Sequence, residues 1–198
     1  MSDIQGDLNA LIGSRLCHDL ISPIGAIANG MELLEMTMPP SPETDLIRQS
    51  VNNVKARIKF FRIGFGLASP EQQTGIGEIA PIVQNFFSSD RLNVRWHPQV
   101  DIARAEAKAA FLALLCLEEA LPVGGTIDVD RDGEGQWQIL AEGPKLRVIQ
   151  QGWDHLNSGG AIPSGAAHVH FPLLHQWGVT YQRPITGTLS DTRAEIRF

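Results

Sequence analysis

The stretch Arg15-Leu16-Cys17-His18-Asp19-Leu20-Ile21-Ser22-Pro23 decides the fold of the first part of the chain. It lies inside an amphipathic run from about residue 8 to residue 36, in which apolar residues recur every three or four positions. At about 100° per residue, a helix over this run gathers an apolar face made of Leu8, Ile12, Leu16, Leu20, Ile24, Ile27, Met31 and Leu34. The opposite face carries Ser14, Arg15, His18, Ser22, Gly25, Asn29 and Glu32. The pattern predicts a long helix with an outward-facing histidine.

His18 is the first candidate for chemistry in this stretch. An imidazole ordinarily titrates near neutrality, so much of it is an uncharged nucleophile at cellular pH. Asp19 is placed to orient the ring or raise its basicity, and Arg15, one turn earlier, to offset phosphate charge. Ser22 leaves room for a partner, and Pro23, which cannot donate to the Asp19 carbonyl, is expected to bend the helix. An ordinary solvated helix face would carry the same residues, and this alternative stays open.

A second amphipathic run follows the proline-rich break at residues 37–42 and covers about residues 43–65, with Ser41 or Thr44 as its cap. Its apolar positions form a coiled-coil-like seam of Ile47, Val51, Val54, Ile58, Phe61 and Phe65. Two long helices joined by a short loop form an antiparallel hairpin, which by itself seldom buries enough apolar surface. We therefore expect a homodimer that closes a four-helix bundle. A basic ridge beside the seam, Arg48, Lys55, Lys59 and Arg62, fits either a solvated face or docking of an acidic partner.

The rest of the chain shows a mixed pattern of helices and strands. Helices are predicted near residues 76–87, 102–121, 150–156 and 166–177, and strands near 92–97, 126–131, 136–141, 145–149, 179–183 and 193–198. The expected class is α+β, with a helical hairpin at residues 1–68, a linker at 69–75 and an α/β sandwich at 76–198.

Composition narrows the classes of function. With 198 residues, 43% of them hydrophobic, the chain can bury a substantial core, and a net charge of −6 argues against nucleic-acid binding. No apolar run is long enough to span a membrane and no secretion signal precedes Leu8, so a cytoplasmic protein with no membrane partner is expected. Cys17 and Cys116 both lie in helical apolar contexts, so they are expected to be reduced, packed thiols rather than a disulfide or metal ligands. His168, His170 and His175 are candidate metal ligands, since His168 and His175 could share a helix face, but no acid or cysteine at ligand spacing supports a metal site.

Four segments, two of which overlap, carry a resemblance to known families. His18-Asp19-Leu20-Ile21-Ser22-Pro23 resembles the phospho-acceptor box of histidine kinase dimerisation domains. Residues 14–20, 29–34 and 60–66 are similar to the ChpT-type bacterial histidine phosphotransferases. The resemblance implies that His18 accepts a phosphoryl group from a receiver-domain aspartate and passes it to another receiver, with Mg²⁺ supplied by the receiver and no cofactor in this chain. It implies a hybrid histidine kinase and cell-cycle response regulators as partners. It also implies that Ser22 occupies the position at which related kinases often carry a residue that positions hydrolytic water.

The second domain resembles the ATP-binding domain of histidine kinases but departs from it at the nucleotide site. Cys116 stands where that family has a magnesium-binding asparagine, and a thiol suits a hard cation poorly. Ala141-Glu142-Gly143-Pro144 replaces the adenine-binding motif, and the glycine-rich lid is missing. We therefore expect no ATP binding. The alternatives are an ATP-dependent histidine kinase and a non-catalytic dimeric adaptor that docks receivers.

Overall fold

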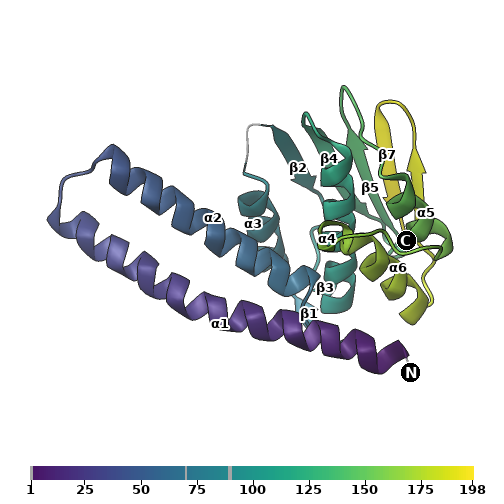
Figure 1. The fold of residues 1–198 in the computed structure, drawn as a ribbon, viewed down its shortest axis with the longest axis horizontal. Coiled ribbons are helices and arrows are strands. Elements are labelled where there is room, and N and C mark those ends of the chain that lie inside the picture. Colours follow the sequence, from purple (N-terminus) through teal and green to yellow (C-terminus); the bar gives the residue numbers. More distant parts are fainter. Residues whose placement is uncertain (1, 70, 89–90) are drawn as a thin grey trace. The chain divides into compact units, whose positions relative to one another are not determined.

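The chain forms two compact units, residues 1–69 and 70–198, in a computed structural model. The structure describes residues 2–69, 71–88 and 91–198, with the backbone only for residues 2–7. Unit 1 is helical and unit 2 combines helices with a sheet (Figure 1). The predicted α+β class, a helical hairpin followed by an α/β sandwich, is therefore confirmed.

Unit 1 consists of helix α1 (Ser2–Thr37) and helix α2 (Pro42–Gly64), which run antiparallel side by side (Figure 1). A capping box begins α2: the Thr44 N–H donates to Ser41 Oγ at 3.3 Å, and the Ser41 N–H donates to Thr44 Oγ1 at 3.0 Å. Pro42 occupies the first turn, where its missing N–H costs nothing. The predicted hairpin and its cap are thus confirmed.

The side of α1 that faces α2 differs from the predicted apolar face. The buried residues of α1, which mark the packed side of the helix, are small or flexible, namely Ala10, Cys17, Ala28 and Met31. Of the predicted face only Met31 is among them, while Leu16 and Leu20 are 58% and 51% exposed. Small side chains let the two helices approach closely, which turns the larger leucines away from α2. The apolar face is real, but the hairpin itself does not cover it.

Unit 2 is built on a five-stranded sheet with the order β2-β4-β5-β7-β6. Strand β2 (Leu92–Trp96) runs parallel to β4 (Gly125–Arg131). The antiparallel strands β5 (Trp137–Glu142), β7 (Arg193–Arg197) and β6 (Thr186–Leu189) follow across the sheet. The short strands β1 (Gln73–Thr74) and β3 (Ile102–Ala103) form a separate antiparallel pair.

Three helices cover one face of this sheet (Figure 1): α4 (Arg104–Ala120), α5 (Gln150–Ser158) and α6 (His170–Thr180). Helix α3 (Ile76–Phe86) packs beside β2, and the 3₁₀ turn η1 (Ala166–His168) precedes α6. The core lies between sheet and helices, where alternate strand residues meet α4; fully buried members include Phe111, Leu114, Ile127, Ile139 and Ile196. Both cysteines are buried free thiols, as predicted.

The Glu106 carboxylate of α4 accepts hydrogen bonds from three other segments of unit 2. Glu106 accepts hydrogen bonds from Arg131 Nε at 3.0 Å, Arg183 Nη1 at 3.2 Å and Trp137 Nε1 at 3.1 Å. These partners come from β4, from the segment after α6 and from β5. One acid therefore compensates two partly buried cations.

Two predicted strands are wrong. Residues 145–149 form a loop because both edges of β5 are already paired, with β4 and with β7, and the Arg147 N–H donates to the Ala120 carbonyl at 3.0 Å. Residues 179–183 do not form a strand because α6 continues to Thr180. A left-handed residue, Gln182 (φ 53°), then turns the chain, and the Arg183 N–H donates to the Gly178 carbonyl at 2.9 Å.

The predicted helix over residues 166–177 is split. The 3₁₀ turn η1 ends at His168, and α6 begins at His170. Pro172 then falls within the first turn of α6, where a helix tolerates a residue that lacks an N–H. Among the described helices, none has the length and apolar content required to cross a lipid bilayer.

Candidate functional site

His18 projects from the middle of α1 with 82% of its side chain exposed. Its Nδ1 lies 3.2 Å from Asp19 Oδ1, and Arg15 Nε donates to Asp19 Oδ2 at 2.8 Å. Both partners are also exposed, with 49% of the Asp19 side chain and 75% of the Arg15 side chain open to solvent. The structure thus brings together three of the predicted site residues in one Arg–Asp–His chain on the helix surface.

The charge state of Asp19 fixes the tautomer of His18. The hydrogen bond from His18 and the hydrogen bond and charge of Arg15 lower the pKa of Asp19 below its ordinary value. An ionised carboxylate only accepts hydrogen bonds, so a hydrogen bond between the two side chains requires the proton of the neutral imidazole on Nδ1, facing Asp19. Nε2 then keeps its lone pair. The arrangement presents an outward-facing nucleophilic nitrogen in the middle of the helix.

The surroundings of His18 on α1 are open. Ser22, one turn later, is exposed, and a Cβ built on Gly25 would meet no atom within 4 Å. Helix α1 is continuous through Pro23, whose ring removes the N–H that would otherwise donate to the Asp19 carbonyl. A protein that approaches His18 therefore meets small side chains.

Helix α2 carries the basic ridge of Arg48, Lys55, Lys59 and Arg62. Arg48 is engaged within unit 1 by Asp45 and by Glu35, whose Oε1 lies 3.6 Å from Arg48 Nε. Lys59 is exposed, and Arg62 lies close enough to Cys17 for its charge to act on that thiol. Burial raises the pKa of Cys17, and the charge of Arg62 offsets this only in part, so the thiol beside the acceptor candidate stays protonated at neutral pH.

Ser14 makes a contact that the sequence did not indicate. Its Oγ accepts a hydrogen bond from the backbone N–H of Leu67 at 2.9 Å. The two residues lie 53 positions apart, and in the sequence Ser14 belongs to the polar face of the first predicted helix and to the segment 14–20 that carries the resemblance. No local pattern could have paired them.

Unit 2 holds a second group of titratable side chains around the carboxylate of Glu119, near the end of α4. His168 Nδ1 lies 2.9 Å from Glu119 Oε1, and Arg147 Nη2 lies 3.4 Å from the same oxygen. His170 Nε2 lies 3.2 Å from Glu119 Oε2 without hydrogen-bond alignment. Burial and, to a smaller extent, the nearby His168 lower the pKa of His170 to about 4, although Glu119 acts in the opposite direction. His170 is therefore neutral at pH 7.

This buried histidine should make unit 2 sensitive to acid. In the unfolded chain His170 takes up a proton below its ordinary pKa of 6.5, whereas the folded protein resists protonation down to about 4. The free energy of unfolding should therefore fall between pH 6.5 and pH 4, by about 3 kcal/mol from this residue. His170→Gln should remove that part of the pH dependence.

Tryptophan fluorescence during denaturation measures this effect in unit 2 alone, because all four tryptophans (Trp96, Trp137, Trp153 and Trp177) lie there. The same substitution at the exposed His18, in unit 1, is the matched control. Equal acid dependence in wild type and His170→Gln would show that His170 does not carry the effect.

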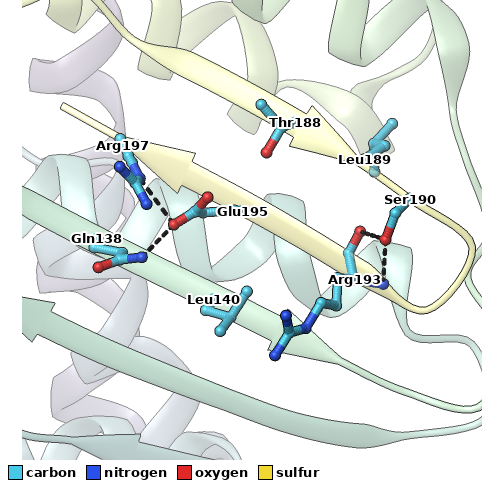
Figure 2. A pocket seen from close by; sticks show the side chains of 8 residues that line it. All are labelled: Gln138, Leu140, Thr188, Leu189, Ser190, Arg193, Glu195 and Arg197. Atoms are coloured by element: carbon cyan, nitrogen blue, oxygen red, sulfur yellow. Dashed lines mark hydrogen bonds and ion pairs between the residues drawn. The ribbon is translucent and has the colours of Figure 1, made fainter.

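A shallow pocket of about 330 Å³ lies on the sheet face opposite the helices (Figure 2). Gln138, Leu140, Arg193, Glu195 and Arg197 of β5 and β7 line it, together with Thr188, Leu189 and Ser190. Its charges are already paired within the sheet: Glu195 contacts Gln138 and accepts from Arg197 Nε at 2.8 Å, and Arg193 pairs with Glu142. No charge is left over here to select a ligand.

The two histidines that were expected to share a helix face, His168 and His175, have different partners. His168 contacts Glu119, whereas His175 Nδ1 lies 3.0 Å from the Leu156 carbonyl. Within the described ranges, no three side chains of His, Cys, Asp or Glu are grouped as a metal ion would require.

Comparison with known proteins gives consistent results. A family model, "Histidine phosphotransferase C-terminal domain", matches residues 76–192. The chain is 36% identical to the protein phosphotransferase ChpT of Brucella abortus (strain 2308) over 177 residues. This alignment covers 85% of this chain and 84% of the Brucella protein. A solved structure described as a bacterial phosphotransferase is similar, with a TM-score of 0.69, 29% identity and coverage of 96% of this chain and 95% of that one.

A more distant similarity concerns the fold alone. Full-length ShkA in complex with AMPPNP matches with a TM-score of 0.50 and 13% identity, over 94% of this chain and 44% of that one. The family model spans more than half of the chain and the Brucella relative most of it, which confirms the resemblance found in the sequence. This chain belongs to the histidine phosphotransferase family.

Proposed function

We propose that this chain is the histidine phosphotransferase of a cytoplasmic bacterial phosphorelay and that His18 is its phospho-acceptor. One observation carries the assignment: His18 is 82% exposed on α1, and its Nδ1 faces an ionised Asp19, which leaves Nε2 free to react. The expected partners are receiver domains, of a hybrid histidine kinase on one side and of response regulators on the other.

The chemistry needs little beyond positioning. The Nε2 lone pair attacks the phosphorus of a receiver's phosphoaspartate, an N–P bond forms, and the P–O bond to the aspartate breaks, releasing its carboxylate. The proton stays on Nδ1, where Asp19 stabilises the positive charge that develops on the ring. Attack by a second receiver's carboxylate reverses these steps, and Mg²⁺ comes with the receiver. Arg15 holds Asp19 and adds positive charge near the phosphoryl group, and Ser22 is the candidate for positioning hydrolytic water.

Asp19→Asn should test the role assigned to the carboxylate. An amide can donate as well as accept, so it no longer holds the proton on Nδ1 or stabilises the charged ring. We expect a rate of phosphoryl uptake roughly 10-fold lower, a smaller loss than at a buried site because water replaces part of the interaction. Rapid-quench measurement of labelled protein gives the rate, with Asp45→Asn on α2 as the control. An unchanged rate would remove Asp19 from the mechanism.

A homodimer is part of this proposal. The exposed leucines and isoleucines of α1, among them Ile12, Leu16, Leu20 and Ile27, lie about 100° around the helix from the side that faces α2. A helix in a four-helix bundle contacts neighbours on two adjacent sides, and a second hairpin would cover the second side. His18 points away from both sides and would stay accessible.

ATP has no place in the proposed reaction. In the segment that resembles the nucleotide-binding region of kinases, the Glu119 carboxylate is already surrounded by His168, His170 and Arg147. The sequence departures at Cys116 and at residues 141–144 agree with this view. Labelling of the purified protein by ATP alone would favour the kinase alternative.

Transfer through the protein between two receivers tests the proposal. A phosphorylated receiver is mixed with this protein, removed, and replaced by a second receiver. We expect the label to move onto this protein and then onto the second receiver, and the label on this protein to be acid-labile and base-stable. A protein that binds both receivers but never carries label would be an adaptor.

A further inference from the structure

We propose that Ser14 is a positioning residue for His18. Ser14 lies one turn before His18 on α1, and its hydrogen bond to the chain just after α2 holds the two helices in one relative position. This inference rests on the proposed function, since it concerns the setting of the same histidine. It uses contacts within unit 1 only.

The first contact is polar. Ser14 Oγ accepts from the Leu67 N–H at 2.9 Å. Leu67 follows the C-terminal end of α2, whose capping residue Phe65 donates its N–H to the Phe61 carbonyl at 2.8 Å. Leu67 lies beyond this last helical hydrogen bond, and the side chain of the other helix accepts from its N–H.

Two glycines, one on each side of the contact, leave room beside Ser14. A Cβ built on Gly13 would lie 2.7 Å from the Phe65 carbonyl oxygen. A Cβ on Gly66 would lie 2.3 Å from the Arg62 carbonyl oxygen and 3.1 Å from Ser14 Oγ. The Gly13 contact shows that the backbone of α1 lies close to the end of α2, and the Gly66 contact with Arg62 lies within the end of α2 itself.

The hydrogen bond of Ser14 restricts the relative position of α1 and α2 more than apolar packing alone would. Two packed helices can slide or rotate slightly while their apolar side chains stay in contact, because dispersion and burial are not directional. A hydrogen bond requires one distance and one direction, so it is satisfied in one setting of α1 only. Ser14 and His18 are four residues apart on the same face, so this setting fixes where the imidazole stands above the hairpin.

Phosphoryl exchange depends on such placement, because small displacements of a reacting group slow transfer strongly. Ser14→Ala removes the hydrogen bond and keeps both the helix and the glycine contacts. We expect the maximal rate of phosphoryl uptake to fall roughly 10-fold, while the receiver concentration for half-maximal rate stays unchanged. Ser14→Thr keeps the γ-hydroxyl and should restore the rate to within about twofold of wild type.

The experiment combines rapid-quench transfer with hydrogen exchange at the Leu67 amide. Ser50, an exposed serine on α2 whose hydroxyl donates to the Leu46 carbonyl at 2.8 Å, gives the matched control Ser50→Ala. We expect faster Leu67 exchange and slower transfer in Ser14→Ala, and neither change in Ser14→Thr or Ser50→Ala.

Three results would overturn the inference: an unprotected Leu67 amide in the wild-type protein, wild-type transfer by Ser14→Ala, or slow transfer by Ser14→Thr despite a protected Leu67 amide. Absence of phosphoryl uptake by the wild-type protein would instead overturn the proposed function, because Leu67 exchange is read without any transfer.

Discussion

His18→Gln is expected to abolish the uptake of phosphoryl groups from every phosphorylated receiver. Glutamine has a similar reach and remains compatible with the exposed helix surface, but its amide nitrogen has no available lone pair. No other described side chain of unit 1 combines an unprotonated nitrogen with this exposure. The stable label on the protein should therefore fall to background, which labelled-receiver assays measure directly.

Unit 2 offers a close control for this variant. His97 also has a carboxylate partner, with Nε2 at 3.0 Å from Asp128 Oδ1, and half of its side chain is exposed. Arg95 contacts the same Asp128, so the group repeats the Arg–Asp–His chemistry of the proposed site. His97→Gln should leave uptake unchanged. If His97→Gln lost the label and His18→Gln kept it, the phospho-acceptor would lie in unit 2, which would contradict the assignment of His18.

Leu16→Glu combined with Leu20→Glu should convert the proposed dimer into a monomer. Each leucine is more than half exposed in the single chain, and each would be buried by a second hairpin. Burial of a leucine is worth roughly 2 kcal/mol, and an unpaired carboxylate at the same place adds a desolvation penalty. Because each dimer carries four of these leucine-to-glutamate substitutions, the dissociation constant of the dimer should rise roughly 10³-fold or more.

Sedimentation velocity measures this change as a shift from twice the 21.7 kDa chain mass to the chain mass itself. Leu33→Glu is the control, because Leu33 is 65% exposed but lies on another side of α1. Unchanged tryptophan fluorescence would show that unit 2 stays folded. A wild-type protein that sediments as a monomer, or a variant that remains a dimer, would contradict the proposed bundle.

The sequence predicted the elements of unit 1 well because their signals are local. The spacing of the apolar residues is enough to place His18 outward on α1, and Ser41 with Thr44 is enough to begin α2. It did not predict which side of α1 faces α2. Periodicity identifies the most apolar face, whereas the hairpin packs through Ala10, Cys17 and Ala28, whose small side chains allow a close approach.

In unit 2 the errors arise where tertiary contacts override local preference. The β-branched Val179 and Thr180 favoured a strand, but they complete a helix that packs on α4 and α5. The contacts of Glu119 with His168 and of Ser14 with Leu67 join residues 49 and 53 positions apart. Neither leaves a pattern in the sequence, because only the fold brings these residues together.

Identification of the atom that carries the phosphoryl group tests the proposed acceptor directly. The protein is phosphorylated by a receiver and studied by phosphorus–proton correlation NMR with assigned histidine signals. We expect a single phosphohistidine, at His18, with phosphorus on Nε2, and loss of this signal when a second receiver is added. Phosphorus on another residue, or on Nδ1 of His18, would contradict the proposed acceptor or the tautomer that Asp19 imposes.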